Sequence, residues 1–295
     1  MLKDYYALAK PGIIMGNLIA TASGFFLASK GNIDFTLLLY VLAGTALVIA
    51  SGCVFNNYID RDIDVKMERT KRRVLVLGKV SNTAALVYAA VLGVLGFGAL
   101  ALLTNHVALL FAALGFVVYV VTYSLYYKRS SVHGTLIGSL SGACPPVIGY
   151  VTVSGQFDAA GAILLIVYCL WQIPHSYAIA IYRFDDYKAA NIPVLPVKQG
   201  IKAAQVHMIG YIIGFAVAAM LLAERGYAGN LYALVIGLMS LYWLYLAKVG
   251  YQKDQESAWG KKLFIFSILM IVSFSVLISV DYVSEPLHTP MAMLH

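Results

Sequence analysis

Carboxylate and amide side chains gather directly after an apolar stretch that is long enough to cross a bilayer. On a helix, Asn57, Asp60 and Asp64 are spaced i, i+3, i+7 and share one face, whereas Asp62 points to the opposite side. Asn56 lies close enough to the shared face that spacing alone does not exclude it. Carboxylates at a membrane boundary are costly unless they bind a cation or line a wet cavity. The pattern therefore predicts a polar site that holds a divalent metal.

The segment from Asp60 to Arg73 combines acids with many cations. A metal-bridged diphosphate needs carboxylate or amide oxygens for Mg²⁺, and Lys or Arg side chains for its outer phosphate oxygens. Both kinds of partner occur in this segment. The alternative is a solvated charged loop held by i, i+4 salt bridges.

A second polar stripe ends at Asp186. Backwards along a helix from that residue, the side chains that fall near one direction include Tyr182, Ile179, His175, Gln172 and Trp171. A proline inside the stripe could kink the helix and open room for a ligand. We favour a substrate-facing histidine here over one that is only hydrogen-bonded to a neighbouring helix. Asp185 or Asp186 could each be the acid of this cluster. Periodicity favours Asp186, because Asp185 points about 100° away on a helix, and the alternative for Asp185 is a charge that faces water.

Small residues and prolines characterise the apolar segment around residue 142. Gly134, Gly138 and Gly142 recur every four residues, a spacing that lets helices approach closely. We therefore favour packing over direct ligand contact for these glycines. Pro145 and Pro146 should break or bend the segment.

Tyrosines line the preceding apolar segment. Tyr126 and Tyr127 fit an aromatic belt at the membrane interface. Tyr119 and Tyr123 lie deeper, and the pattern leaves open whether they line a cavity.

Composition places the chain in a membrane. Of its 295 residues 61% are hydrophobic and 12% are charged, whereas soluble domains carry about 25% charged residues. We predict an all-α integral membrane protein, a single transmembrane domain over residues 1–295, with about nine helices bundled around a central cavity that opens towards the cytoplasm. The apolar segments are Ile13–Ser29, Phe35–Phe55, Thr83–Thr104, Val107–Tyr126, Gly134–Val153, Ala160–Tyr182, Val206–Ala223, Leu231–Ala247 and Phe264–Val280.

The cations predict the orientation. With nine spans and a cytoplasmic N-terminus, nineteen of the 21 Lys and Arg residues fall on the cytoplasmic side, and only Lys30 and Arg225 do not. The C-terminus then lies on the opposite side. The net charge of +7 is explained by this topology and is not a nucleic-acid signature. We find no cleavable signal peptide, and we assign the three cysteines to packing.

Several motifs together resemble those of the UbiA-type intramembrane prenyltransferases. Asn57-x-x-Asp60-x-x-x-Asp64 is similar to their first acidic motif, and the cluster at Asp186 stands where their second lies. The likeness extends to one branch, the heme O synthases. The matching stretches are Lys10–Gly12, Asn56–Asp64, Met67–Thr70, Gly142–Gly149, Trp171–Tyr177 and Asp186–Pro196. The second acidic motif departs from the usual two acids four residues apart, because only Asp186 with Tyr187 is evident.

The resemblance implies that farnesyl diphosphate and heme B are the substrates, with Mg²⁺ as the divalent metal, in the cell inner membrane. Heme B is a substrate here, not a cofactor. A heme-accepting terminal oxidase or its assembly machinery is an implied partner, besides the lipid bilayer. A quinone-precursor prenyltransferase, a non-catalytic heme-handling protein and a transporter are the alternatives. A transporter usually places its charges near the midplane and shows repeated halves.

The resemblance also implies roles for individual residues. The implied catalytic residues are Asp60, Asp64, Asp186 and Arg61. The implied metal ligands are Asn57, Asp60, Asp64 and Asp186. The implied substrate-binding residues are Lys66, Arg69, Arg73, Lys128, Tyr123, Tyr187, Trp171, Gln172 and His175. Tyr119, Tyr123 and Trp171 would shield carbocations with their π faces, and Gln172 and His175 would contact the heme through its iron or a propionate.

Overall fold

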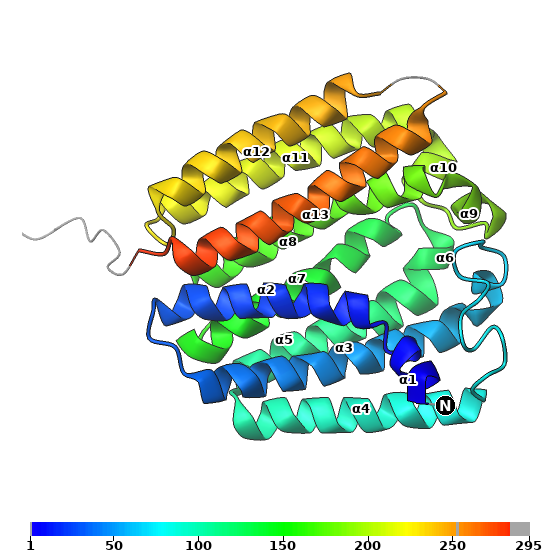
Figure 1. Cartoon of the computed structure of the whole chain (residues 1–295), viewed down its shortest axis with the longest axis horizontal. Helices are drawn as coiled ribbons and strands as arrows, with labels where there is room; N and C mark the ends of the chain where they lie inside the picture. The colour runs from blue at the N-terminus through cyan, green and yellow to red at the C-terminus, as the bar shows by residue number, and fades with distance from the viewer. Residues whose placement is uncertain (1, 252–253, 284–295) are drawn as a thin grey trace, which may run out of the picture.

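The computed structural model describes residues 2–251 and 254–283, and these are helical almost throughout (Figure 1). In chain order the helices are α1 (Leu2–Leu8), α2 (Pro11–Ser29), α3 (Phe35–Asp64), α4 (Asn82–Leu103), α5 (His106–Val117), the π-helix η1 (Val118–Tyr127), α6 (Lys128–Ser130), α7 (Gly134–Ser154), α8 (Ala159–Tyr182), α9 (Phe184–Ala189), α10 (Leu195–Gln199), α11 (Ile201–Glu224), α12 (Asn230–Val249) and α13 (Glu256–Val280).

Within the described residues, nine helical stretches are long and apolar enough to cross a membrane. The fourth stretch runs through α5, η1 and α6, and the others are α2, α3, α4, α7, α8, α11, α12 and α13. This confirms the predicted count and the all-α membrane fold. The helix α3 extends beyond its apolar part and carries the predicted acidic face on its last turns.

Polar side chains cap the start of several spans. Asp34 accepts hydrogen bonds from the first backbone N–H groups of α3, at 2.9 and 3.0 Å. Ser81, Asn105 and Asp158 do the same for α4, α5 and α8. Such caps satisfy N–H groups that have no partner within the helix, and they fix where each span begins.

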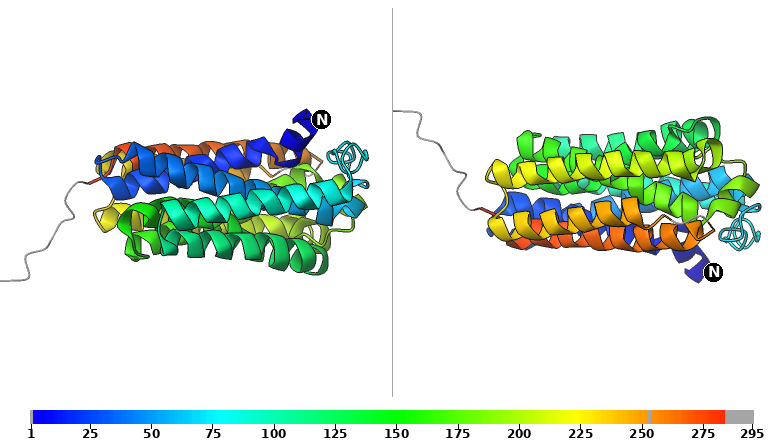
Figure 2. Two further views of the ribbon diagram at one scale, coloured as in Figure 1. Left: turned by 90° about the horizontal axis from the view of Figure 1, so that it is seen from below. Right: turned by 90° about the horizontal axis from the view of Figure 1, so that it is seen from above.

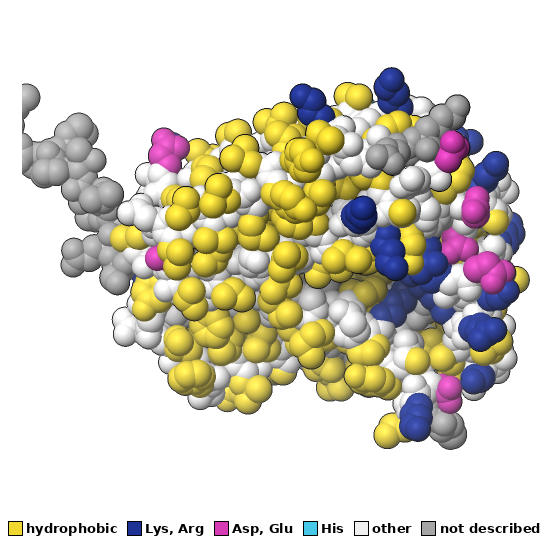
Figure 3. Space-filling view, turned by 45° about the horizontal axis from the view of Figure 1, so that its top comes forward, with side chains coloured by type: hydrophobic (Ala, Val, Ile, Leu, Met, Phe, Trp, Pro, Cys, Tyr) yellow, Lys and Arg dark blue, Asp and Glu magenta, His cyan; other side chains and the backbone are white. Residues whose placement is uncertain are grey.

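The long helices run side by side along the longest axis of the molecule (Figure 2). α2 packs along α7, α3 along α4, and α8 contacts α7, α11 and α13. The short helices α1, α6, α9 and α10 gather at one end, which we call the polar end (Figure 1). On the face shown in Figure 3, Lys and Arg side chains are concentrated towards this end, and hydrophobic side chains cover most of the rest.

The proline pair does not break the fifth span. α7 is one helix through Pro145 and Pro146, so a break at this point was a wrong prediction. The reason lies in the packing against α2. A Cβ atom at Gly149 would collide with the backbone carbonyl of Thr21, and one at Gly24 with that of Pro146. Backbones this close support a segment that has lost two N–H donors.

The fourth span contains a feature that the hydropathy pattern does not indicate. Between Val118 and Tyr127 it is a π-helix, and the N–H of Lys128 donates to the carbonyl of Tyr123, five residues earlier. With about 4.4 residues per turn, each residue turns the helix by less than it does in an α-helix. Tyr119 and Tyr123 share one face in either kind of helix, whereas Tyr126, seven residues from Tyr119, shares that face only in an α-helix. Tyr126 is 63% exposed, in agreement with a place at the membrane interface.

Candidate active site

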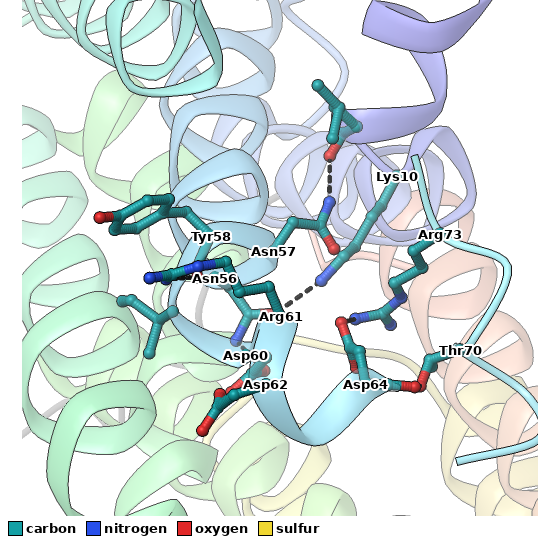
Figure 4. Close-up of polar contacts among 12 residues, drawn as sticks. Lys10, Asn56, Asn57, Tyr58, Asp60, Arg61, Asp62, Asp64, Thr70 and Arg73 are labelled. Carbon is teal, nitrogen blue, oxygen red and sulfur yellow. Dashed lines mark hydrogen bonds and ion pairs between the residues drawn. The ribbon is translucent and has the colours of Figure 1, made fainter. Parts of the chain in front are cut away.

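The acidic face of α3 is buried at the polar end. Asn57, Asp60 and Asp64 are each at most 4% exposed, while Asp62 is exposed, which is the division that helical spacing predicts. Figure 4 shows Lys10 and Arg73 reaching this end of α3 from other parts of the chain. Buried carboxylates are stable only with partners, so the partner of each acid describes the site.

Asp60 is the most enclosed of these acids. Its Oδ2 atom forms an ion pair with Nζ of Lys128 and accepts a hydrogen bond of 2.8 Å from Nδ2 of Asn56. Its Oδ1 atom is buried without a hydrogen bond, and the nearest cation is Nη2 of Arg129 at 3.7 Å. The carboxylate therefore has one oxygen that is free to accept a further ligand.

The π-helix explains why Lys128 reaches Asp60. In an α-helix Lys128 would lie on the side opposite Tyr119, because nine steps of about 100° per residue add up to two and a half rotations. Nine residues of a π-helix nearly complete two rotations and return Lys128 to the face of Tyr119. Ser124, on the same π-helix, accepts a 2.9 Å hydrogen bond from Asn56. The unusual helix thus brings a cation and a hydroxyl to the acidic face.

Asp64 and Asp186 are joined to the loop that follows α3. Nη1 of Arg73 lies 2.6 Å from Oδ2 of Asp64, and Oγ1 of Thr70 donates to the carbonyl of Asp64 at 3.0 Å. The backbone N–H of Glu68 donates to Oδ1 of Asp186 at 2.7 Å. One loop therefore ties the first acidic motif on α3 to the second on α9.

An apolar contact supports this bridge. The loop and both acidic segments bury a small cluster made of Ile63, Met67, Ala190 and Ile192. Asp186 is 8% exposed and the neighbouring Asp185 is exposed. The acid of the second cluster that faces the site is thus Asp186, as the stripe indicates.

A cavity of about 650 Å³ lies beside the second acidic cluster, and Tyr187, the neighbour of Asp186, is part of its lining. Its volume is within the size range of small-molecule sites. Apolar side chains make up most of its lining. Its polar and aromatic lining includes Tyr119, Tyr123, Trp171, Gln172, His175 and Tyr187. The rings of Tyr119 and Tyr123 are stacked with centroids 6.3 Å apart, so the deeper tyrosines line a cavity.

Packing explains the glycines of α7. A Cβ atom at Gly142 would meet the side chain of Gln172, and one at Gly138 would lie 3.1 Å from the ring of Tyr123. Nε2 of Gln172 donates to the carbonyl of Ser139 at 3.1 Å. The glycines therefore give aromatic and amide side chains the room to lie along the cavity.

The structure does not bring every predicted cation to the acids. The guanidinium of Arg61 lies 4.1 Å from the ring centroid of Tyr58 and donates to the carbonyl of that residue at 2.5 Å. In this structure Arg61 therefore lies against its own helix, and its predicted catalytic role stays a prediction. Lys66 and Arg69 are exposed on the loop.

Arg69 nevertheless lies near the cavity. Burial raises the pKa of the Tyr187 phenol, and the Arg69 guanidinium acts in the opposite direction. Since Tyr187 lines the cavity, the loop places the charge of Arg69 close to its polar end.

Sequence reasoning missed Lys10 as a member of this site. Its Nζ atom donates to Oδ1 of Asn56 at 2.5 Å, and burial lowers the pKa of its ammonium group to about 8. Its backbone is left-handed, with φ of 55°, between α1 and α2. A non-glycine residue rarely adopts this conformation. Its place directly before an apolar span was the signal available in the sequence.

The oxygen atoms of the site suit Mg²⁺, which prefers oxygen ligands and is commonly bound by one or two carboxylates plus substrate phosphates. Among the described residues, three buried side-chain oxygens have no hydrogen-bond partner, and two of them belong to this site, Oδ1 of Asn57 and Oδ1 of Asp60. Nδ2 of Asn57 donates to the carbonyl of Leu8 at 2.8 Å, which leaves Oδ1 of Asn57 free.

In the described part of the chain, no three His, Cys, Asp or Glu side chains converge on one point as a metal cluster. The predicted set of Asn57, Asp60, Asp64 and Asp186 is thus not assembled, and each acid has its own protein partner. The set stays a prediction that requires Lys128 and Arg73 to exchange partners.

Comparison with known proteins shows the family and the fold. Residues 17–269 match the model of the UbiA prenyltransferase family. The fold is similar to that of a digeranylgeranylglyceryl phosphate synthase, with a TM-score of 0.78 at 21% identity over 95% of this chain and 98% of the other. It is also similar to a UbiA homolog from Archaeoglobus fulgidus bound to GPP and Mg²⁺, with a TM-score of 0.73 at 18% identity over 94% and 100%.

The chain therefore belongs to the UbiA prenyltransferase family and is a multi-pass membrane enzyme. It is 58% identical to protoheme IX farnesyltransferase 2 of Pseudomonas fluorescens (strain Pf-5), over 95% of each chain. It is 57% identical to the protoheme IX farnesyltransferases of Serratia proteamaculans, over 96% of this chain and 95% of that one, and of Escherichia coli O139:H28, over 99% of each.

Proposed function

We propose that this enzyme transfers the farnesyl group of farnesyl diphosphate to a vinyl group of heme B, with addition of water, to give heme O and diphosphate. The C1–O bond of farnesyl diphosphate breaks, and the electron pair leaves with the diphosphate. The vinyl group attacks C1, water captures the resulting cation as a hydroxyl, and one proton is released. Relatives that share 57–58% identity over nearly the whole chain support these substrates.

The observation that carries the proposal is the join between the two acidic motifs beside an aromatic cavity. The backbone N–H of Glu68 donates to Asp186, and the side chain of Arg73, in the same loop, binds Asp64. Tyr187, the neighbour of Asp186 in the chain, lines the cavity. An allylic diphosphate is amphipathic in the same way. Its anionic head fits the charged end, and its hydrocarbon tail fits the apolar cavity.

Mg²⁺ would be held by Asn57, Asp60, Asp64 and Asp186. When bound, it supplies positive charge that neutralises the leaving diphosphate. Around it, the chain's own cations bind the outer phosphate oxygens. These are Lys10, Lys66, Arg69, Arg73 and Lys128.

The cavity wall acts on the organic parts of the two substrates. Tyr119, Tyr123 and Trp171 present π faces that stabilise a carbocation and exclude water until the vinyl group has attacked. Tyr187 contacts the prenyl donor near the polar end, and Gln172 and His175 contact the heme. In this division the charged side chains bind only the donor, and the side chains that contact the acceptor are neutral.

The proposed location is the cell inner membrane, with the N-terminus and the polar end on the cytoplasmic side. The distribution of Lys and Arg supports this orientation. The C-terminus, expected on the opposite side, lies outside the described residues. A single domain over residues 1–295 and a terminal oxidase, or its assembly machinery, as the partner that accepts the product complete the proposal.

The test is an assay of the purified full chain with heme B, farnesyl diphosphate and Mg²⁺, read by mass spectrometry. We expect a heme product that gains one farnesyl group and one water, and no such product in a sample treated with EDTA. A parallel sample with a phenolic quinone precursor in place of heme separates the runner-up function. Prenylation of the phenol alone would overturn the proposal.

A further inference from the structure

His175 is held more firmly than a general contact residue needs to be. It lies on α8 and lines the cavity. Its ring stacks on Trp171, with centroids 4.6 Å apart and planes 26° apart, and the ring of Phe264 lies 5.2 Å away. Rings from two different helices therefore fix the plane of the imidazole.

A hydrogen bond to Ser267 fixes which ring nitrogen carries the proton. Nδ1 of His175 and Oγ of Ser267 are 2.7 Å apart. The Ser267 hydroxyl also donates to the carbonyl of Phe264 at 2.7 Å, and a hydroxyl has one hydrogen to give. Both contacts are satisfied together when Nδ1–H of His175 donates to Ser267. This assignment leaves Nε2 of the neutral ring with a lone pair.

Nε2 of His175 has no hydrogen-bond partner among the described residues. His175 lines a mostly apolar cavity, and Nε2 is not among the buried side-chain atoms that lack a partner, so it is open to that cavity. No carboxylate in the described part of the chain forms an ion pair with this ring to hold a second proton. The ligand that fits must therefore accept electrons or donate a proton.

This favours the heme iron over a heme propionate as the group that Nε2 contacts. An ionised propionate has only acceptor oxygens, so it would have to bring a proton with it to bind a lone pair. The heme iron is an electron acceptor, and a neutral imidazole whose other nitrogen donates a hydrogen bond is its common protein ligand. We propose that Nε2 of His175 is the axial ligand of the heme iron, with Ser267 as the positioning residue that fixes its tautomer.

The inference rests on the proposed function only in taking heme as the acceptor, and it adds how heme is held. An iron anchor on α8 fixes the centre of the porphyrin, so that a vinyl group at its edge is presented at a fixed distance from α8. The rings of Trp171 and Phe264 pack against His175 and keep its imidazole from turning.

The test compares heme with metal-free protoporphyrin IX, which has the same ring and propionates but no iron. Binding of each is titrated by absorbance or fluorescence to the purified full chain without farnesyl diphosphate. We expect His175→Ala to weaken heme binding by about 10–100-fold, to remove the spectrum of a histidine-bound heme, and to leave protoporphyrin IX binding unchanged. Exogenous imidazole should restore that spectrum.

His207→Ala is the matched control, because His207 also lies on a membrane helix but is exposed. It should leave both titrations unchanged. Equal weakening of heme and protoporphyrin IX by His175→Ala would overturn the iron contact. An unchanged heme spectrum with lost turnover would also overturn it and would make His175 a base for the attacking water.

Two further variants keep the inference testable if His175→Ala folds poorly. His175→Cys should convert the spectrum to that of a thiolate-bound heme. Ser267→Ala should keep histidine ligation but weaken heme binding by about 10-fold. Failure of the proposed function looks different, because wild-type protein would then show a histidine-bound heme and form no farnesylated product.

Discussion

At the polar end, each buried acid meets a cation or an N–H group from outside its own helix. Along the wall formed by α8 and α13, in contrast, the polar groups meet neutral partners. Asp60 pairs with Lys128, and Asp64 with Arg73. His175 pairs with the Ser267 hydroxyl, and the Trp171 N–H donates to the Ser267 carbonyl at 2.7 Å.

The two kinds of partner suit different tasks. Ion pairs at the polar end can be exchanged, because a diphosphate and a metal offer the same charges that the side chains already offer one another. The contacts of His175 and Trp171 on the wall of α8 and α13 join neutral groups, which a charged ligand would not replace. Ring stacking fixes the geometry of this wall before a ligand binds. The donor site is therefore built to rearrange, and the acceptor site is built to stay as it is.

The largest expected effect follows from removing one charge at the exchangeable end. Asp60→Asn should lower the rate of farnesyl transfer by about 100–1000-fold, because Lys128 loses its partner and the leaving group loses its counter-charge. Asp62→Asn is the matched control, on the same helix but exposed. Asp62 forms an ion pair of 2.7 Å with Nη1 of Arg129 at the surface. Asp62→Asn should change the rate less than about 3-fold, since exposed ion pairs contribute little. A fully active Asp60→Asn enzyme would remove Asp60 from the site.

A second prediction separates the scaffold from the cavity wall. Gly149→Ala should destabilise the protein by about 1–3 kcal/mol, because its Cβ atom would push the backbone of α2 away. Gly142→Ala should retain most of the stability, because its Cβ atom meets the end of the flexible Gln172 side chain. Thermal unfolding in detergent measures both. Equal unfolding temperatures of the Gly149→Ala and Gly142→Ala variants would show that α2 can move away from α7 without loss of stability.

The third prediction concerns Lys10 and pH. Its pKa of about 8 is below the ordinary value of 10.5, so its charge is lost as the pH rises through about 8. If that charge binds diphosphate, kcat/KM for farnesyl diphosphate should fall about 10-fold per pH unit above that point. Lys10→Arg stays charged and should flatten the profile.

Stability should respond to pH with the opposite sign. The folded protein binds fewer protons at Lys10 than the unfolded chain between about pH 8 and the ordinary lysine value. This group therefore favours folding increasingly as the pH rises through that window. Lys10→Met should remove the contribution. A wild-type kcat/KM profile that stays flat to pH 9.5 would show that the ammonium group does not contact the donor.

Hydropathy and helical spacing predicted the nine spans, the buried face of Asp60 and Asp64, and the choice of Asp186 over Asp185. These features depend on local periodicity, which a sequence displays directly. The pairing of Lys128 with Asp60 could not be predicted from α-helical periodicity. That periodicity places Lys128 on the side opposite Tyr119, and only the π-helix brings it to the acidic face.

Long-range contacts account for the other gaps. Lys10 and Asn56 meet across 46 residues, and Ser267 meets His175 across 92. Nothing in either local pattern specifies the partner. The proline pair was misjudged for the same reason, since the support for α7 comes from the backbone of α2.

The smallest expected effect concerns Arg61, a predicted catalytic residue that lies against Tyr58 in the structure. Arg61 and Arg73 are both near the acidic face in sequence, but Arg61 stacks on Tyr58 while Arg73 binds Asp64. Arg61→Ala should therefore lower kcat/KM less than about 3-fold, because it removes a contact of about 0.5–1 kcal/mol on the outer side of α3. Arg73→Ala, measured in the same assay, should lower it about 10–100-fold, because it removes the partner of a buried carboxylate as well as a phosphate ligand. If the two variants lost equal activity, Arg61 would have to leave Tyr58 when the donor binds. The exchange of partners would then extend to the cations that the resting structure holds outside the site.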